Sequence, residues 1–287
     1  MKPSRTRHPG WLKVPLPAGK NFHEVRRLVE SNQLHTVCQS AHCPNIGECW
    51  GHRTATFMIL GDTCTRNCRF CAVKSGAPQS IDYAEPHRVA EAVKMLSLKY
   101  AVITSVTRDD LDDGGASIFA DTIYQIKKVV PGCQVEVLVP DFNGSESALS
   151  IVIVAEPDVL NHNLETVPAL YPIARPEADC QRSLKLLALA KEKGMLIKTG
   201  LMLGLGETNE EVISVMHDLR KIDCDILTLG QYLRASSEHL AIHRYVTPEE
   251  FAELKRTGIR MGFRHIEAGP LVRSSYHAAS SFEEISN

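Results

Sequence analysis

Long apolar runs are missing from this chain of 287 residues, and their absence argues against a membrane protein. No stretch reaches the about 18 consecutive apolar residues that a transmembrane helix needs. An excess of either charge is missing as well, since 32 Lys and Arg face 34 Asp and Glu and the formal net charge is -2. Without a strong positive field, nucleic acid is not an expected partner. The 44% hydrophobic and 23% charged residues are typical of a soluble globular protein.

A secretory signal is not expected either, because residues 1–20 contain prolines and no apolar core of the length that a signal peptide needs. We therefore expect a cytoplasmic protein. In a reducing compartment, nine cysteines indicate metal binding or catalysis rather than disulfides. Six of them fall between Cys38 and Cys71. The scattered Cys133, Cys180 and Cys224 are expected to be inert packing residues.

Short β-branched runs alternate with segments of helical period from residue 54 onward. They predict six strands, within residues 54–62, 100–108, 134–141, 158–165, 196–204 and 225–233. Repeated βα units imply a parallel sheet, and their even length favours a barrel. The predicted fold is therefore α/β: a partial (β/α)6 TIM-type barrel over residues 54–263, with an N-terminal extension over 1–53 that carries three of the cysteines and a short C-terminal tail over 264–287. Within the barrel, Thr208 and Glu211 predict a capping box, and Gly194 predicts a helix end.

Polar or Gly-rich segments follow the predicted strands, namely "GDTC", "TRDDLDDGG", "NHNLE", "GLGE" and "GQYLR". Each alone reads as a solvated turn. In parallel barrels the carboxyl ends of the strands lie at one face, where active sites are found. Together these segments predict a ligand site at that face.

Cys64, Cys68 and Cys71 have the spacing C-x3-C-x2-C, directly after the first predicted strand. A structural zinc wants four ligands, and this spacing fits a zinc knuckle poorly. Three thiolates instead hold three irons of a cubane cluster and leave the fourth iron open. The motif in this position resembles the radical S-adenosylmethionine (SAM) superfamily. The resemblance implies that SAM binds the open iron, that its reductive cleavage yields a 5'-deoxyadenosyl radical, and that Phe70 lies against the adenine. Phe70 also reads as a core anchor of the loop.

A second trio, Cys38, Cys43 and Cys49, precedes the first and lacks a nearby fourth cysteine. Together with "TSVTRDDLDDGGA", "NHNLETV", "KTGLMLGLGE" and the terminal "RSSYHA", the two cysteine motifs resemble the lipoyl synthase family over nearly the whole chain. The resemblance implies that the second trio and Ser275, or less favourably Ser274, hold an auxiliary cluster. A serine oxygen is a harder donor than a thiolate, so it is a plausible ligand to lose.

The implied reaction inserts two sulfur atoms, taken from the auxiliary cluster, at carbons 6 and 8 of a protein-bound octanoyl chain. The implied cofactors are two [4Fe-4S] clusters and SAM, with two SAM consumed. The implied partners are an octanoylated lipoyl carrier domain of a 2-oxoacid dehydrogenase complex or a glycine cleavage H protein, an electron donor such as flavodoxin or ferredoxin, and an iron-sulfur cluster carrier.

The remaining polar loops supply candidates for SAM contacts. Glu165 is the favoured ribose ligand, because a carboxylate can accept two hydroxyls. "GLGE" is expected to bring backbone amides near a ligand, His162 to be a packed histidine with a satisfied hydrogen bond, and Arg273 to hold the terminal serine motif. The other candidate SAM contacts are Thr104, Ser105, Asn161 and Asn163.

Two other functions remain open at this point. One is a different sulfur-inserting radical enzyme, resembling biotin synthase or a methylthiotransferase. The other is an iron-sulfur carrier or zinc-stabilised binding module, which would not cleave SAM. If the N-terminal extension and the tail both cover the barrel, the Cys38 trio lies near the barrel opening.

Overall fold

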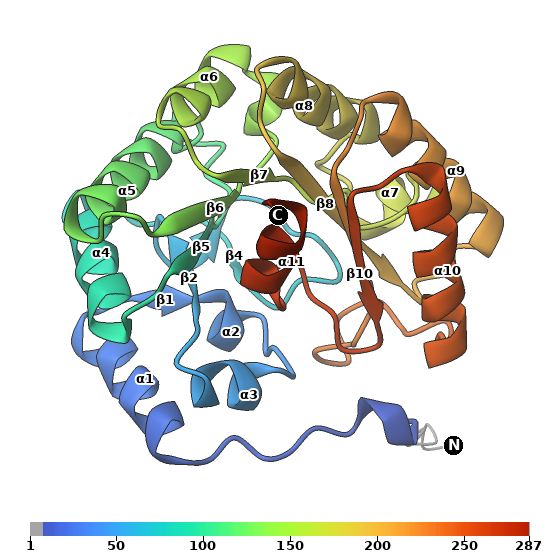
Figure 1. Cartoon of the computed structure of the whole chain (residues 1–287), viewed down its shortest axis with the longest axis horizontal. Helices are drawn as coiled ribbons and strands as arrows, with labels where there is room; N and C mark the ends of the chain where they lie inside the picture. Colours follow the sequence, from blue (N-terminus) through green and yellow to red (C-terminus); the bar gives the residue numbers. More distant parts are fainter. Residues whose placement is uncertain (1–7, 287) are drawn as a thin grey trace.

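A curved, mostly parallel sheet forms the centre of the computed structural model, which describes residues 8–286 (Figure 1). Residues 1–7 of the predicted extension and Asn287 of the predicted tail lie outside the described part. Every neighbouring pair of strands in this sheet is parallel except β1 with β2. The edge strands do not pair with each other, so the barrel is open. In spatial order the strands are β1 (His35–Thr36), β2 (Thr56–Ile59), β5 (Tyr100–Ser105), β6 (Gln134–Leu138), β7 (Val159–Asn161), β8 (Ile197–Leu203), β9 (Ile226–Gln231) and β10 (His265–Gly269).

Helices follow the parallel strands and cover the outer face of the sheet, which confirms the predicted α/β barrel (Figure 1). The predicted capping box is present, because Thr208 Oγ1 accepts from the Glu211 N–H at 3.2 Å and the Glu211 carboxylate accepts from the Thr208 N–H at 2.8 Å. Gly194 follows α8 with a φ of +84°. In the described part of the chain, no helix combines the length and the apolar character needed to cross a membrane. The covering helices are α4 (Glu85–Leu96), α5 (Ala116–Val129), α6 (Glu146–Val154), α8 (Cys180–Glu192), α9 (Asn209–Lys221) and α10 (Pro248–Met261).

The N-terminal extension adds α1 (Lys20–Ser31), α2 (Val37–Ser40) and α3 (Ile46–Gly51). Helix α1 packs against α3 and α4, and the rings of Phe22 and Trp50 lie 5.3 Å apart. Figure 1 shows α2 and α3 at the gap between the two edges of the sheet. The smaller elements are η1 (Gly10–Leu12), β3 (Thr63–Cys64), β4 (Lys74–Ser75), η2 (Phe142–Gly144), η3 (Pro168–Leu170) and α7 (Tyr171–Ala174).

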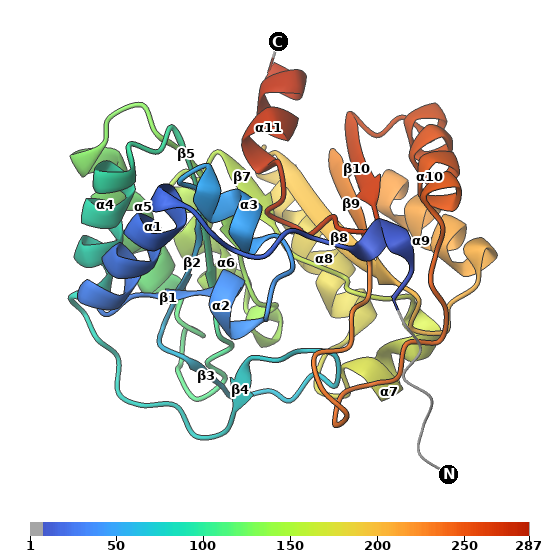
Figure 2. The ribbon, with the colours of Figure 1, turned by 90° about the horizontal axis from the view of Figure 1, so that it is seen from below.

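The segment predicted as a short tail contains β10 and α11 (Ala278–Ser286), so a seventh parallel strand follows the six predicted ones. The sequence "HIEAG" is short and mixes polar with apolar residues, and eight residues separate it from the next helix, so only its pairing with β9 identifies it as a strand. Beyond β10 the chain enters the barrel. Figure 2 shows α11 at the end opposite β3 and β4, where Ala278 packs against Tyr100 and Val102.

A charged layer lies inside the barrel near that end. Lys198 Nζ donates to both carboxylate oxygens of Glu136 at 2.9 and 3.0 Å, and both side chains are 1% exposed. Tyr100 and Asn161 donate to the same carboxylate at 2.7 and 3.1 Å. Because each charge is paired and hydrogen-bonded, the layer is tolerated in the interior.

Candidate functional site

The cysteine loop, residues 60–76, follows β2 and carries the predicted radical-cluster ligands. Cys64 Sγ accepts the backbone N–H groups of Arg66 at 3.4 Å and Thr107 at 3.3 Å, and the Cys71 N–H donates to the Cys68 carbonyl at 3.0 Å. Burial, together with nearby acidic groups and the other thiols, raises the pKa of Cys68 to about 11 and that of Cys71 to about 12. Cys68 and Cys71 therefore need a cation beside them to become thiolates, and Cys64 is close enough to influence both.

Arg66, between the first two cysteines, ties this loop to the neighbouring strand ends. Its 5% exposed guanidinium donates two hydrogen bonds to Asp109, at 2.7 and 2.8 Å, one to Asp141 at 2.7 Å and one to Asn143 at 2.8 Å. Burial alone would raise the pKa of Asp141, but the hydrogen bond and charge of Arg66 outweigh it and hold that pKa well below its usual range. We did not predict Arg66 as a site residue. Two features of the sequence could have indicated this contact, namely the acidic residues of the "TRDD" segment and the arginine inside the cysteine motif.

The loop after β9 holds the other end of the cysteine loop. His239 Nε2 donates to the Cys71 carbonyl at 3.0 Å, while its Nδ1 accepts from Ser236 Oγ at 2.8 Å. The Leu240 N–H donates to the Arg69 carbonyl at 3.0 Å. His239 was not predicted as a site residue either, because its contact joins residues that lie 168 positions apart in the sequence.

The second trio lies on the N-terminal extension, with Cys38 in α2, Cys49 in α3 and Cys43 between them. The Cys43 N–H donates to the Cys38 carbonyl at 3.0 Å. Burial raises the pKa of all three thiols, and burial with the charges of Cys38 and Cys43 raises that of Cys49 to about 12. The second trio is thus also a group of neighbouring, buried thiols.

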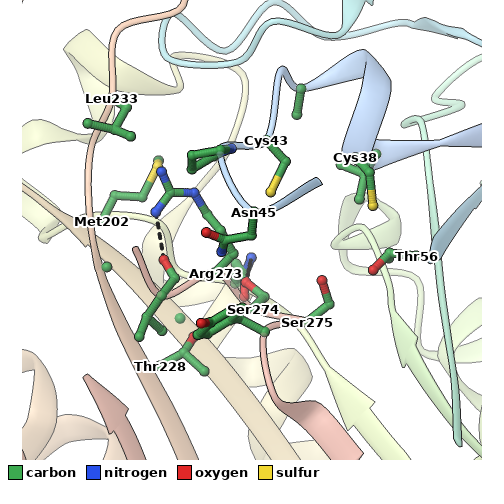
Figure 3. Close-up of a pocket in the computed structure, with 18 of the residues that line it drawn as sticks. Cys38, Cys43, Asn45, Thr56, Met202, Thr228, Leu233, Arg273, Ser274 and Ser275 are labelled. Atoms are coloured by element: carbon green, nitrogen blue, oxygen red, sulfur yellow. Dashed lines mark hydrogen bonds between the residues drawn. The ribbon is translucent and has the colours of Figure 1, made fainter. Parts of the chain in front are cut away.

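One cavity of about 470 Å³ is lined by the whole second trio and by Cys71 of the cysteine loop, while Cys64 and Cys68 are not among the described residues that line it. Figure 3 shows Cys38, Cys43 and Ser275 turned toward the same part of this cavity. The Cys38 trio therefore lies beside the barrel interior, in agreement with the expected position near its opening. The predicted site residues that line the cavity are Cys38, Cys43, Cys49, Phe70, Cys71, Asn161, Asn163, Glu165 and Ser275, and Ser274 lines it as well.

Two predicted SAM contacts are not among the described residues that line the cavity. Thr104 Oγ1 donates to the Leu138 carbonyl at 3.1 Å. The Ser105 hydroxyl is buried without a hydrogen-bond partner in residues 8–286. Their position at the end of β5 does not bring them to the cavity wall.

The "GLGE" amides are not open to a ligand, so that prediction is wrong. The backbone N–H groups of Gly204, Leu205 and Gly206 all donate to the Glu207 carboxylate, at 2.5, 2.9 and 3.1 Å. The segment's own glutamate folds back and satisfies them. The prediction for His162 is confirmed, since the buried ring bonds the Val139 carbonyl at 2.8 Å and Ser183 Oγ at 2.9 Å.

Glu165 places a carboxylate on the cavity wall, where burial raises its pKa. Asn163 Nδ2 donates to Glu165 Oε1 at 3.1 Å. Nearby, the Arg175 guanidinium donates to the carbonyls of Asn163 and Leu164 at 2.9 and 3.1 Å. These contacts fix a carboxylate that can accept ribose hydroxyls.

The two serines of "RSSYHA" have different surroundings. Ser274 Oγ accepts a hydrogen bond from Asn163 Nδ2 at 2.7 Å. Ser275 Oγ has no hydrogen-bond partner within residues 8–286, and it faces the cavity (Figure 3). Arg273 was predicted to hold the serine motif in place. Its guanidinium donates to the Val272 carbonyl at 2.6 Å, so this hydrogen bond joins two adjacent residues of the segment that carries the serines.

The donors present fit iron-sulfur clusters. Soft thiolates are the ligands that such clusters take, and a cluster spreads its ligands over several irons. Among residues 8–286, no three His, Cys, Asp or Glu side chains converge as the ligands of a single metal ion would. The thiols of each trio are nevertheless neighbours that influence one another's pKa.

Comparisons with known proteins agree with this chemistry. Residues 58–219 match the family model of the radical SAM superfamily, and residues 1–43 match that of the N-terminal domain of lipoyl synthase. Lipoyl synthase from Rubrobacter xylanophilus is 57% identical over 98% of this chain and 88% of its own length, and that from Roseiflexus sp. is 57% identical over 96% and 92%.

Among solved structures, the [FeFe]-hydrogenase maturase HydG superposes with a TM-score of 0.60 at 15% identity, over 79% of this chain and 54% of HydG, and so shares the fold. The family is shown by the matches over nearly the full chain. This chain is a member of the lipoyl synthase family within the radical SAM superfamily.

Proposed function

We propose that this lipoyl synthase works with two clusters that meet at one cavity. Cys64, Cys68 and Cys71 hold the [4Fe-4S] cluster that, when bound, supplies the electron for reductive cleavage of SAM. Cys38, Cys43, Cys49 and Ser275 hold an auxiliary [4Fe-4S] cluster, the source of the sulfur that is inserted at carbons 6 and 8 of a protein-bound octanoyl chain. The observation that carries this assignment is the single cavity lined by Cys38, Cys43, Cys49 and Ser275 and, from the cysteine loop, by Cys71.

The chain's own side chains position the reactants. We assign the SAM ribose to Glu165, whose carboxylate is oriented by Asn163. Val102, Leu138 and Met202 give the cavity apolar walls, and we assign the octanoyl chain to them. At roughly 0.8 kcal/mol per buried methylene, most of an octanoyl chain contributes about 5 kcal/mol to binding. Holding it still next to the SAM site converts hydrogen removal into an intramolecular event.

The partners are also part of the proposal. The octanoyl chain arrives on a carrier, either a lipoyl domain of a 2-oxoacid dehydrogenase complex or a glycine cleavage H protein. Flavodoxin or ferredoxin is the expected electron donor, and an iron-sulfur carrier is expected to rebuild the auxiliary cluster. All nine cysteines are free, which suits a reducing cytoplasm.

The test is anaerobic and compares cluster content with chemistry. Wild type, the Cys38→Ala/Cys43→Ala/Cys49→Ala variant and Ser275→Ala are reconstituted, and iron, sulfide, 5'-deoxyadenosine and lipoyl product are measured. We expect about eight irons in wild type and about four in the triple variant, which still cleaves SAM but forms no lipoyl product. The matched control is Cys133→Ala/Cys180→Ala/Cys224→Ala, which should keep about eight irons. Loss of SAM cleavage in the triple variant, or full auxiliary iron and normal product in Ser275→Ala, contradicts the assignment.

A further inference from the structure

The C-terminal segment that carries Ser275 is bound on both sides of that residue by α3, the helix that carries Cys49, and by the N-cap residue of that helix, Asn45. Asn45 Nδ2 donates to the Leu271 carbonyl at 2.7 Å, and Tyr276 OH donates to Glu48 Oε1 at 3.1 Å. We call residues 271–276 the tail strap. Its ends are therefore fixed relative to the second cysteine trio, but these two contacts alone do not determine which serine faces that trio.

Two glycines on neighbouring strands make room for the tail strap. A Cβ on Gly230 of β9 would lie 2.1 Å from the Val272 carbonyl oxygen, and a Cβ on Gly200 of β8 would lie 3.2 Å from Ser274 Oγ and 2.5 Å from Thr228 Oγ1. Neither glycine has a positive φ, so backbone conformation does not require glycine at either position. At Gly230 a side chain is excluded by the close approach of the tail strap. At Gly200 it is excluded by the side chains of Ser274 and Thr228 together.

Asn163 supplies the polar contact that distinguishes the two serines. Its amide is 8% exposed and donates to Ser274 Oγ at 2.7 Å, opposite Gly200. Since Ser274 and Ser275 are adjacent, a slip of the tail strap by one residue would exchange them. The hydrogen bond satisfies Ser274 and leaves the Ser275 hydroxyl facing the cavity.

We propose that Gly200, Gly230 and Asn163 are positioning residues that fix the register of the tail strap, so that Ser275 and not Ser274 meets the Cys38, Cys43 and Cys49 group. This inference rests on the proposed role of Ser275 as a cluster ligand. Asn163 also bonds Glu165, so one amide links the strap to the proposed ribose site. Residues that hold a ligand in place typically change metal affinity by about tenfold to a hundredfold when removed.

The experiment measures how fast a chelator removes auxiliary-cluster iron, anaerobically and without SAM, in otherwise wild-type reconstituted enzyme. Gly230→Ala must displace the Val272 carbonyl, and we expect auxiliary iron to be lost about tenfold to a hundredfold faster, as in Ser275→Ala, while the radical cluster keeps its iron. The matched control is Gly51→Ala, also beside the second trio, because no atom lies within 4 Å of its added Cβ. It should lose iron at the wild-type rate.

A second test uses substitutions that remove atoms and so create no steric overlap. The variants are Asn163→Ala, Ser274→Ala and the double variant. If Asn163 acts through Ser274, each single variant and the double variant should accelerate iron loss by similar factors, because the effects of one shared contact are not additive. Unfolding midpoints of the cluster-free chains establish that each variant folds.

The outcomes separate the two proposals. If Ser275→Ala loses auxiliary iron at the wild-type rate, its role as a ligand fails. If Ser275→Ala accelerates the loss but Asn163→Ala and Ser274→Ala do not, the ligand assignment stands and the positioning role of Asn163 is overturned. If folded Gly230→Ala retains auxiliary iron like wild type, the role of the glycines is overturned.

Discussion

Replacing Arg66 with methionine tests whether a buried ion-pair network holds the cysteine loop. The substitution keeps much of the side-chain length but removes four hydrogen bonds to Asp109, Asp141 and Asn143. Asp141 is fully buried and would keep Arg182 as its remaining ion-pair partner, at 2.7 Å. Removing one partner of a buried pair costs about 3–5 kcal/mol when the other charge is left uncompensated. Because Arg182 still pairs with Asp141, we expect Arg66→Met to lower the free energy of unfolding by about 3 kcal/mol, the lower end of that range.

The pH dependence of this loss identifies its cause. In wild type the pKa of Asp141 lies below its ordinary value of 3.8, so its contribution to stability is present at neutral pH and is lost as the pH falls through the lower folded pKa. Without Arg66, burial should raise this pKa above its wild-type position, and protonation then relieves the part of the charge that Arg182 alone does not compensate. The difference between wild type and Arg66→Met should therefore shrink as the pH is lowered from 7 toward 4.

Guanidinium unfolding of the cluster-free chain, followed by circular dichroism, measures the stability difference, and iron retention at Cys64, Cys68 and Cys71 measures the effect on the loop. The control is Arg26→Met, which removes an exposed pair with Glu30 and should leave the midpoint unchanged. Stability within about 0.5 kcal/mol of wild type, with normal iron retention, would refute the reasoning.

Three further predictions concern the barrel interior and the SAM site. Lys198→Met should lower the free energy of unfolding by about 3–5 kcal/mol, because it leaves the buried Glu136 carboxylate without its cation. Adding Glu136→Gln should recover part of that loss in guanidinium unfolding, and an additive loss contradicts this expectation. Burial lowers the pKa of His162 from 6.5 to about 4, so the unfolded state takes up a proton before the folded state does as the pH falls. The free energy of unfolding of wild type should therefore drop by about 2 kcal/mol between pH 7.5 and 5. If the free energy of unfolding of His162→Gln changes with pH in the same way as that of wild type, His162 is excluded as the source. Glu165→Gln should weaken SAM binding roughly tenfold with unchanged iron content, as measured by equilibrium dialysis, and unchanged affinity contradicts the ribose assignment.

The sequence by itself was sufficient for the features that depend on local spacing. The strands β2, β5, β6, β7, β8 and β9 were predictable because apolar runs of strand length alternate with amphipathic helices. The capping box at Thr208 and Glu211 depends only on residues three positions apart. The cysteine spacing indicated a cluster with an open iron, because the motif lies in one short loop.

Only the tertiary structure decided the features that depend on contacts between distant residues. Strand β10 exists because β9 is available to pair with it, and "GLGE" turns its amides inward because Glu207 can reach them. The different surroundings of Ser274 and Ser275 depend on Asn163, 111 positions earlier than Ser274. No local pattern in "RSSYHA" distinguishes two adjacent serines. Which hydroxyl is left facing the cavity follows from where the barrel strands place an amide and two glycines, since those contacts form only when the chain is folded.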